Sequence, residues 1–259
     1  YKLECAKGER RALVDFQFDL MAVHLTGFEF LTGGKHQEQF YSAVVSGEVD
    51  KLVAQLAPSV AAKIDKPVLA AWANGVKQNL GDFKSLSKTN FGTETETQNG
   101  VSVLKTEGTV LFEKGEGKST IVLAEGKVVK FYLESDKLTL EWLKDPGIAE
   151  LCKARAEEFL TNFLTGKADD AYAAVHEVLR TQLTAEQFKT MVANVNRKAG
   201  AMKSIAFDSL KHTNTEGESF TILLYYKVVC ANDSTMAEVT FQFKDMAAHL
   251  NSFDFTGGS

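Results

Sequence analysis

The chain has 259 residues, of which 44% are hydrophobic and 24% charged, a composition typical of globular domains. Its net charge of −5 argues against nucleic-acid binding, which usually needs a basic stripe. No apolar run approaches the ~20 residues that a membrane-spanning helix requires, so we expect no membrane span. The three cysteines, Cys5, Cys152 and Cys230, are few and odd in number, which argues against a disulfide framework. They do not indicate whether the protein works in an oxidising or a reducing compartment.

Residues 1–34 repeat the end of the chain. The sequence FQFDLMAVHL at 16–25 aligns without gaps with FQFKDMAAHL at 241–250. A second internal match, at a constant shift of about 120 residues, aligns Phe40 with Phe159 and Gly81 with Gly200. We therefore predict that residues 1–34 are the strand half of a partial repeat, and that 35–135 and 154–259 are a first and a second full copy. Such a pattern is typical of a window cut from a longer array.

Each full copy is expected to run from helices to strands. In the second copy, Gly166 is placed to end one helix, Asp169 to cap the next, and Thr184 with Gln187 to form a capping box that opens a third helix ending at Gly200. The hydrophobic period then changes from 3.6 to 2, which predicts strands over 219–230, 236–245 and 247–255.

The first copy follows the same order, with strands expected over 100–114, 119–125 and 128–135. The sequence EKGEGKST at 113–120 superficially resembles a phosphate-binding loop, but it lacks the required spacing and lies between two strands, so we interpret it as a hairpin turn. The predicted fold class is α+β: tandem domains, each with three helices packed on a curved antiparallel sheet. Residues 136–153 contain several large apolar side chains and are expected to form an ordered linker.

The chain resembles the nuclear transport factor 2-like superfamily, which has the cystatin-like cone. The resemblance rests on three N-terminal helices, on a closing hairpin STIVLAEGKVVKFYLES, and on Trp72, Gly81 and Phe83 in LAAWANGVKQNLGDFKS ahead of the sheet. It implies cone-shaped domains in which a curved sheet wraps around a helix. The second copy departs from the pattern, with Met191 in place of Trp72 and Met202 in place of Phe83.

The match is to small bacterial domains of unknown function, and it implies an exported or cell-envelope location that the residues themselves leave open. Members of the superfamily include isomerases, dehydratases, polyketide cyclases and binding modules. The enzymes place an aspartate or histidine base inside the cone.

Candidate ligand-binding residues come from the aromatic and histidine positions. Alternating phenylalanines predict an aromatic sheet face. This face either packs against the helices as core or lines an apolar cone interior that admits a small molecule. His249 is either a ligand or general base at the pocket mouth, or a histidine on the solvated sheet surface, since Ala248 and Leu250 face the other way. The side chains that could line the pocket mouth beside His249, with core packing as the alternative for most of them, are Trp72, Tyr132, Tyr172 and Tyr226.

These observations favour a non-catalytic module that binds a peptide, a protein partner or an apolar small molecule. No metal-ligand spacing, cofactor motif or catalytic constellation recurs in the sequence, so no cofactor, metal or catalytic residue is predicted. The alternative is an isomerase- or cyclase-like enzyme with an acid or base inside one cone. Residues 1–34 are also expected to engage in strand pairing or self-association, because a strand pair without helices exposes a phenylalanine-rich face.

Overall fold

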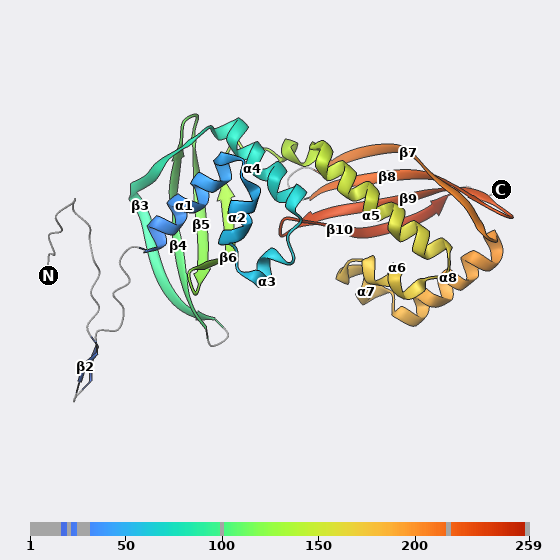
Figure 1. Ribbon diagram of the computed structural model, residues 1–259, viewed down its shortest axis with the longest axis horizontal. Coiled ribbons are helices and arrows are strands. Elements are labelled where there is room, and N and C mark those ends of the chain that lie inside the picture. The colour runs from blue at the N-terminus through green and yellow to red at the C-terminus, as the bar shows by residue number, and fades with distance from the viewer. Residues whose placement is uncertain (1–16, 20–21, 25–31, 99–100, 216–218, 257–259) are drawn as a thin grey trace. The chain divides into compact units, whose positions relative to one another are not determined.

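The computed structural model describes residues 17–19, 22–24, 32–98, 101–215 and 219–256 (Figure 1). They form an α+β fold, as the sequence predicts. The chain divides into two compact units: unit 1 comprises Tyr1–Ala62 and Val76–Leu138, and unit 2 comprises Lys63–Gly75 and Thr139–Ser259. In the described part of the chain, no helix is long and apolar enough to cross a membrane.

Most of the predicted partial repeat at 1–34 lies outside the described residues. Within it, β1 (Gln17–Asp19) pairs antiparallel with β2 (Ala22–His24).

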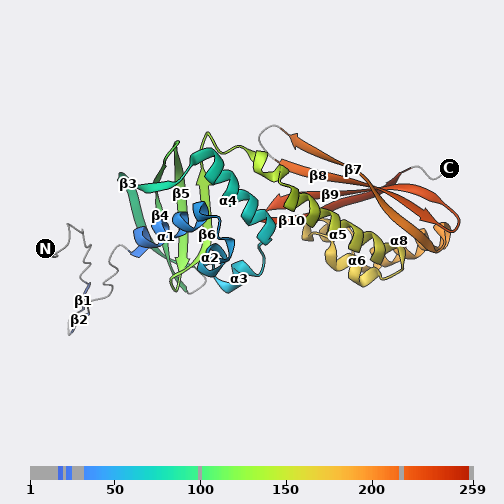
Figure 2. The same cartoon turned by 45° about the horizontal axis from the view of Figure 1, so that its top comes forward.

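Unit 1 has its helices before its strands, and its sheet has the antiparallel order β3-β4-β5-β6. Helix α1 packs on β3 and β4, and Figure 2 shows α1 and α2 on one face of this sheet. The division between the units falls within α4. The helices are α1 (Thr32–Ser46), α2 (Val49–Gln55), α3 (Pro58–Ala61) and α4 (Lys66–Leu80), and the strands are β3 (Phe83–Gln98), β4 (Val101–Phe112), β5 (Glu116–Ala124) and β6 (Lys127–Glu134).

Unit 2 repeats this order of helices followed by a four-stranded antiparallel sheet, β10-β9-β8-β7. A 3₁₀ turn, η1 (Leu140–Lys144), precedes the helices, and the expected linker at 136–153 therefore contains η1 and the start of α5. The helices are α5 (Pro146–Leu164), α6 (Ala168–Ala174), α7 (Glu177–Gln182) and α8 (Ala185–Ala199), and the strands are β7 (Met202–Thr215), β8 (Ser219–Cys230), β9 (Ser234–Lys244) and β10 (Ala247–Thr256).

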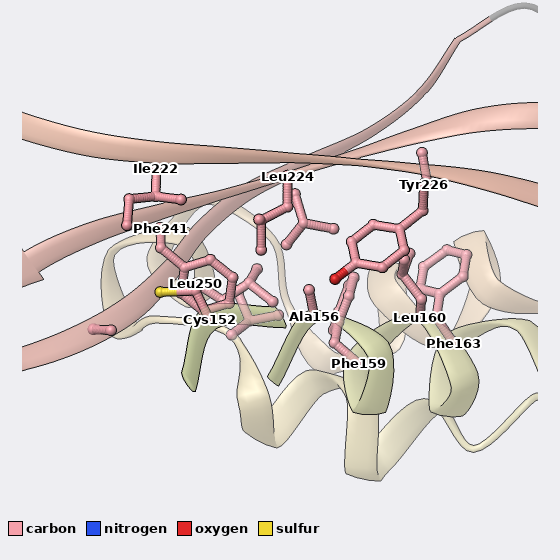
Figure 3. Packing of buried hydrophobic residues seen from close by; sticks show 14 of the residues in the cluster. Cys152, Ala156, Phe159, Leu160, Phe163, Ile222, Leu224, Tyr226, Phe241 and Leu250 are labelled. Carbon is pink, nitrogen blue, oxygen red and sulfur yellow. The ribbon is translucent and has the colours of Figure 1, made fainter. Parts of the chain in front are cut away.

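The core of unit 2 lies between α5 and the inner face of its sheet. Every second residue of β8 points toward α5, including Ile222, Leu224 and Tyr226, because side chains alternate along a strand (Figure 3). Helix α5 packs against them through a buried stripe at helical spacing, which includes Cys152, Ala156, Phe159 and Phe163.

The helices are more numerous than the sequence suggested. The second predicted helix of the second copy is divided into α6 and α7, because Val175 between them pairs with Leu250 of β10. The cap of α6 is Lys167, so the predicted cap Asp169 lies inside the first turn instead. In unit 1, Leu56 pairs with Val128 in the same manner and separates α2 from α3. Backbone pairing with a distant strand therefore ends these helices, a cause that local sequence does not reveal.

Candidate functional site

The candidate site is an apolar cavity of about 300 Å³ in unit 2, which we name the α7–β10 cavity. It lies where residues of three helices meet the last strand of the sheet. Its volume is at the lower end of the range for small-molecule sites. The residues that line it are Phe163 of α5, Leu179 and Leu183 at α7, Met191 and Val195 of α8, and Ser252, Phe253, Asp254 and Phe255 of β10.

Helix α8 forms one wall through its amphipathic spacing. Thr184 and Gln187 form the capping box that the sequence predicts, and Gly200 ends the helix with a φ of 77°. Between these caps, Phe188 and Val192 enter the core while Met191 and Val195 face the cavity. Asn196 ties this wall to α5, since its Nδ2 donates to the carbonyl oxygen of Phe163 at 2.8 Å.

Helix α7 forms the second wall and is held by hydrogen bonds at both ends. At its start, the His176 side chain accepts a hydrogen bond from the backbone of Val178. At its end, the Tyr172 hydroxyl donates to the carbonyl oxygen of Leu183 at 2.9 Å. A helix this short has marginal stability on its own. The two hydrogen bonds stabilise it and so keep Leu179 and Leu183 at the cavity.

Strand β10 supplies the third wall because of a β-bulge between Leu250 and Ser252. In a regular strand, Ser252 and Asp254 would face the helices as Leu250 does. The extra residue reverses this alternation, so Phe253 and Phe255 face the helices instead. Their rings lie 5.4 and 5.2 Å from the ring of Phe163.

The polar groups of the cavity are few and lie at its edge. Ser252 and Asp254 are exposed residues of β10, and the Asp254 Oδ1 atom accepts a hydrogen bond from the backbone N–H of Phe255 at 2.8 Å. Among the described lining residues, Asp254 alone carries a carboxylate. The arrangement can therefore enclose an apolar group and offer hydrogen bonds at the rim.

The predicted pocket-mouth residues are distributed over both units, and the described lining of the cavity does not include them. Trp72 is 3% exposed, whereas Tyr132 is 56% exposed. Tyr172 touches the site indirectly, through its bond to Leu183. Tyr226 is fully buried, which raises its pKa, and its hydroxyl donates to the carbonyl oxygen of Lys153. The half-buried His249 packs on His176, and ligand binding by these residues stays a prediction.

A larger hollow of about 580 Å³ lies between α6 and α8. Its walls include Asp169 and Lys189, which form an ion pair at 3.0 Å and are 80% and 42% exposed. These charged side chains make its lining more polar than that of the α7–β10 cavity, which suits an apolar molecule less well. We therefore place the candidate site at the smaller α7–β10 cavity.

Unit 1 contains a buried polar cluster that the sequence analysis did not identify. The Tyr41 hydroxyl and the Gln37 side-chain amide both donate to Ser119 Oγ. Gln37 Oε1 and the nearby strand hydroxyl Thr106 Oγ1 are buried without a hydrogen-bond partner. Burial raises the pKa of Tyr41, so its hydroxyl stays protonated. The described members of the cluster are hydroxyl and amide side chains, which provide hydrogen bonding.

Comparison with known proteins does not assign the site. No protein-family model matches the chain, and the search of curated proteins finds no match. Within the residues that the structure describes, no group of three or more histidine, cysteine, aspartate or glutamate side chains is placed to hold a metal ion.

Proposed function

We propose that this protein is a non-catalytic binding module and that the α7–β10 cavity of unit 2 holds an apolar small molecule. The observation that carries the proposal is the lining: phenylalanine, leucine, methionine and valine side chains surround about 300 Å³, with polar groups confined to the rim. Small-molecule sites commonly combine such an apolar interior with a few polar groups.

The nuclear transport factor 2-like cone is part of the same proposal. Its support is that each unit runs from helices to a four-stranded antiparallel sheet. The bulge in β10, which turns Phe253 and Phe255 toward the helices, supports a sheet that curves around them. A cavity at one end of such a cone fits a ligand held between sheet and helices.

The carboxylate of Asp254 at the rim restricts the charge that a ligand can carry there. An anionic headgroup at Asp254 would meet a like charge, so uncharged or cationic molecules are favoured over fatty acids. For a neutral ligand of about 17 heavy atoms, such as the fluorophore prodan, about 0.3 kcal/mol per atom gives a Kd on the order of 100 µM.

Fluorescence titration of the full chain with prodan tests this proposal. Val195→Trp fills the cavity and should weaken binding at least tenfold, on the order of 1.4 kcal/mol. Val229→Trp, at a position 36% exposed on β8 and outside the cavity lining, is the matched control and should bind as the unmodified chain does. Met191→Trp gives a second filled variant if Val195→Trp fails to fold, and equal binding by filled and control variants would overturn the proposal.

The alternative is an isomerase- or cyclase-like enzyme, and the observation that favours it is the carboxylate of Asp254 at the cavity rim. Native mass spectrometry of protein from its own source would identify a co-purifying small molecule. Adding that molecule back to protein from which it has been removed distinguishes a binding module from an enzyme. A binding module leaves its mass and structure unchanged, whereas an enzyme converts it and loses the conversion in Asp254→Asn.

A further inference from the structure

Two histidines meet beside the α7–β10 cavity. His176 immediately precedes α7 and His249 lies on β10, and their ring centroids are 4.4 Å apart. In unit 1 the hairpin residue Lys127 reaches toward the helices in a comparable way, with its Nζ on the carbonyl oxygen of Ala54. In the part of the chain that the structure describes, unit 2 therefore has a pair of imidazole rings at this junction, where unit 1 has a lysine.

His176 joins α7 to β10 through separate hydrogen bonds. Its backbone N–H donates to the carbonyl oxygen of Leu250 at 2.9 Å, and its Nδ1 accepts from the backbone N–H of Val178 at 3.4 Å. Accepting that bond requires an unprotonated Nδ1. His249 is held from the other side, with its Nε2 at 3.3 Å from the carbonyl oxygen of Lys244. The neutral imidazole of His176 is thus the form that caps α7.

The charges around His176 oppose its protonation. Partial burial is the largest cause that lowers its pKa, and His249, Lys244 and Arg180 lower it further, while Glu177 alone raises it. Lys244 and His249 face it from the β9–β10 hairpin, and Glu177 and Arg180 face it from α7. Because the pKa is lowered, the contact is stable above the ordinary histidine pKa of about 6.5 and is lost as the pH falls through the lowered value.

We propose that protonation of His176, which packs against His249, loosens α7 from β10 and so releases the apolar ligand at mildly acidic pH. The inference rests on the proposed function, since α7 contributes Leu179 and Leu183 to the cavity wall. A protonated Nδ1 donates a hydrogen bond and no longer caps Val178. The positive charge of Lys244, on the β9–β10 hairpin, repels an imidazolium at His176 as well. Both effects act on the same short helix.

Prodan titrations of the full chain from about pH 7.5 to about pH 5 test the inference. The Kd should rise about tenfold on acidification, because binding of the ligand and protonation of His176 oppose each other. In His176→Asn the ratio of the Kd at about pH 5 to the Kd at about pH 7.5 should fall to about 1, because asparagine caps a helix without titrating.

His212→Asn is the matched control. His212 also has a pKa lowered chiefly by burial, but it lies on β7 outside the cavity lining. It should keep the full pH dependence of the unmodified chain. Equal pH dependence in His176→Asn and His212→Asn, or none in the unmodified chain, would overturn the inference.

Hydrogen exchange without ligand separates this inference from the proposed function. The amides of Val178, Leu179 and Arg180 should lose about tenfold in protection at about pH 5, after correction for intrinsic rates, and should keep it in His176→Asn. If prodan binds at no pH, the proposed function fails while the exchange data still test the histidine pair. If binding occurs but α7 protection is independent of pH, the inference fails and the binding function stands.

Discussion

Replacing Phe163 with alanine removes the ring at the centre of the aromatic cluster of unit 2. The ring is fully buried, and its centroid lies 5.2 to 5.9 Å from those of Phe159, Phe188, Phe253 and Phe255. Truncating a buried phenylalanine costs about 3–5 kcal/mol, and aromatic contacts add to the loss. Because Phe163 already borders a cavity, its neighbours have little scope to fill the space. We expect Phe163→Ala to lower the free energy of unfolding by about 4 kcal/mol.

Tryptophan fluorescence during urea unfolding measures the free energy of unfolding of unit 2, where Phe163 lies. The two tryptophans of the chain, Trp72 and Trp142, both belong to unit 2. The control is Phe207→Ala, since the Phe207 side chain is 39% exposed on β7, and it should cost no more than about 1 kcal/mol. A loss below about 1.5 kcal/mol in Phe163→Ala, or the same loss in both variants, would refute the packing argument.

Other consequences concern single side chains. Thr106→Val should stabilise unit 1 by about 1 kcal/mol, because the buried hydroxyl has no partner and valine keeps its shape; a calorimetric transition that moves downward contradicts this. Arg155→Met should destabilise unit 2 by about 2 kcal/mol, because the Asp65 carboxylate, 12% exposed, loses its guanidinium donors at 2.6 and 2.7 Å; an unchanged urea midpoint argues otherwise. Burial raises the pKa of Cys152 to about 12, so thiol reagents should modify it after unfolding and not before, as peptide mapping would establish.

The sequence predicts the elements of unit 2 where local signals are strong. The strand predicted at 219–230 is β8, and the capping box at Thr184 opens α8. It does not predict β7, because a bulge between Phe207 and Ser209 shifts the inward positions from Ile205 to Leu210 and breaks the alternation. The hairpin interpretation of residues 113–120 is confirmed, since β4 ends at Phe112 and β5 begins at Glu116.

The candidate site was less accessible to prediction because its residues meet only in the folded unit. Leu179, Val195 and Phe255 come from separate elements and carry no local signal that distinguishes them from core residues. The pairing of His176 with His249 likewise depends on the contact of Val175 with Leu250, which joins α7 to a distant strand. The sequence left the direction of Leu250 open and predicted only that His249 faces the opposite way; Leu250 is 3% exposed, and the ring of His249 lies 4.4 Å from that of His176.

Methyl-resolved NMR of the full chain during a prodan titration tests the central claim most directly. The account predicts saturable shifts at the methyl groups of Leu179, Leu183, Met191 and Val195, which line the α7–β10 cavity, with Val110 and Leu123 in the core of unit 1 unmoved. Shifts confined to methyl groups outside the cavity, or none at prodan concentrations well above about 100 µM, would contradict it.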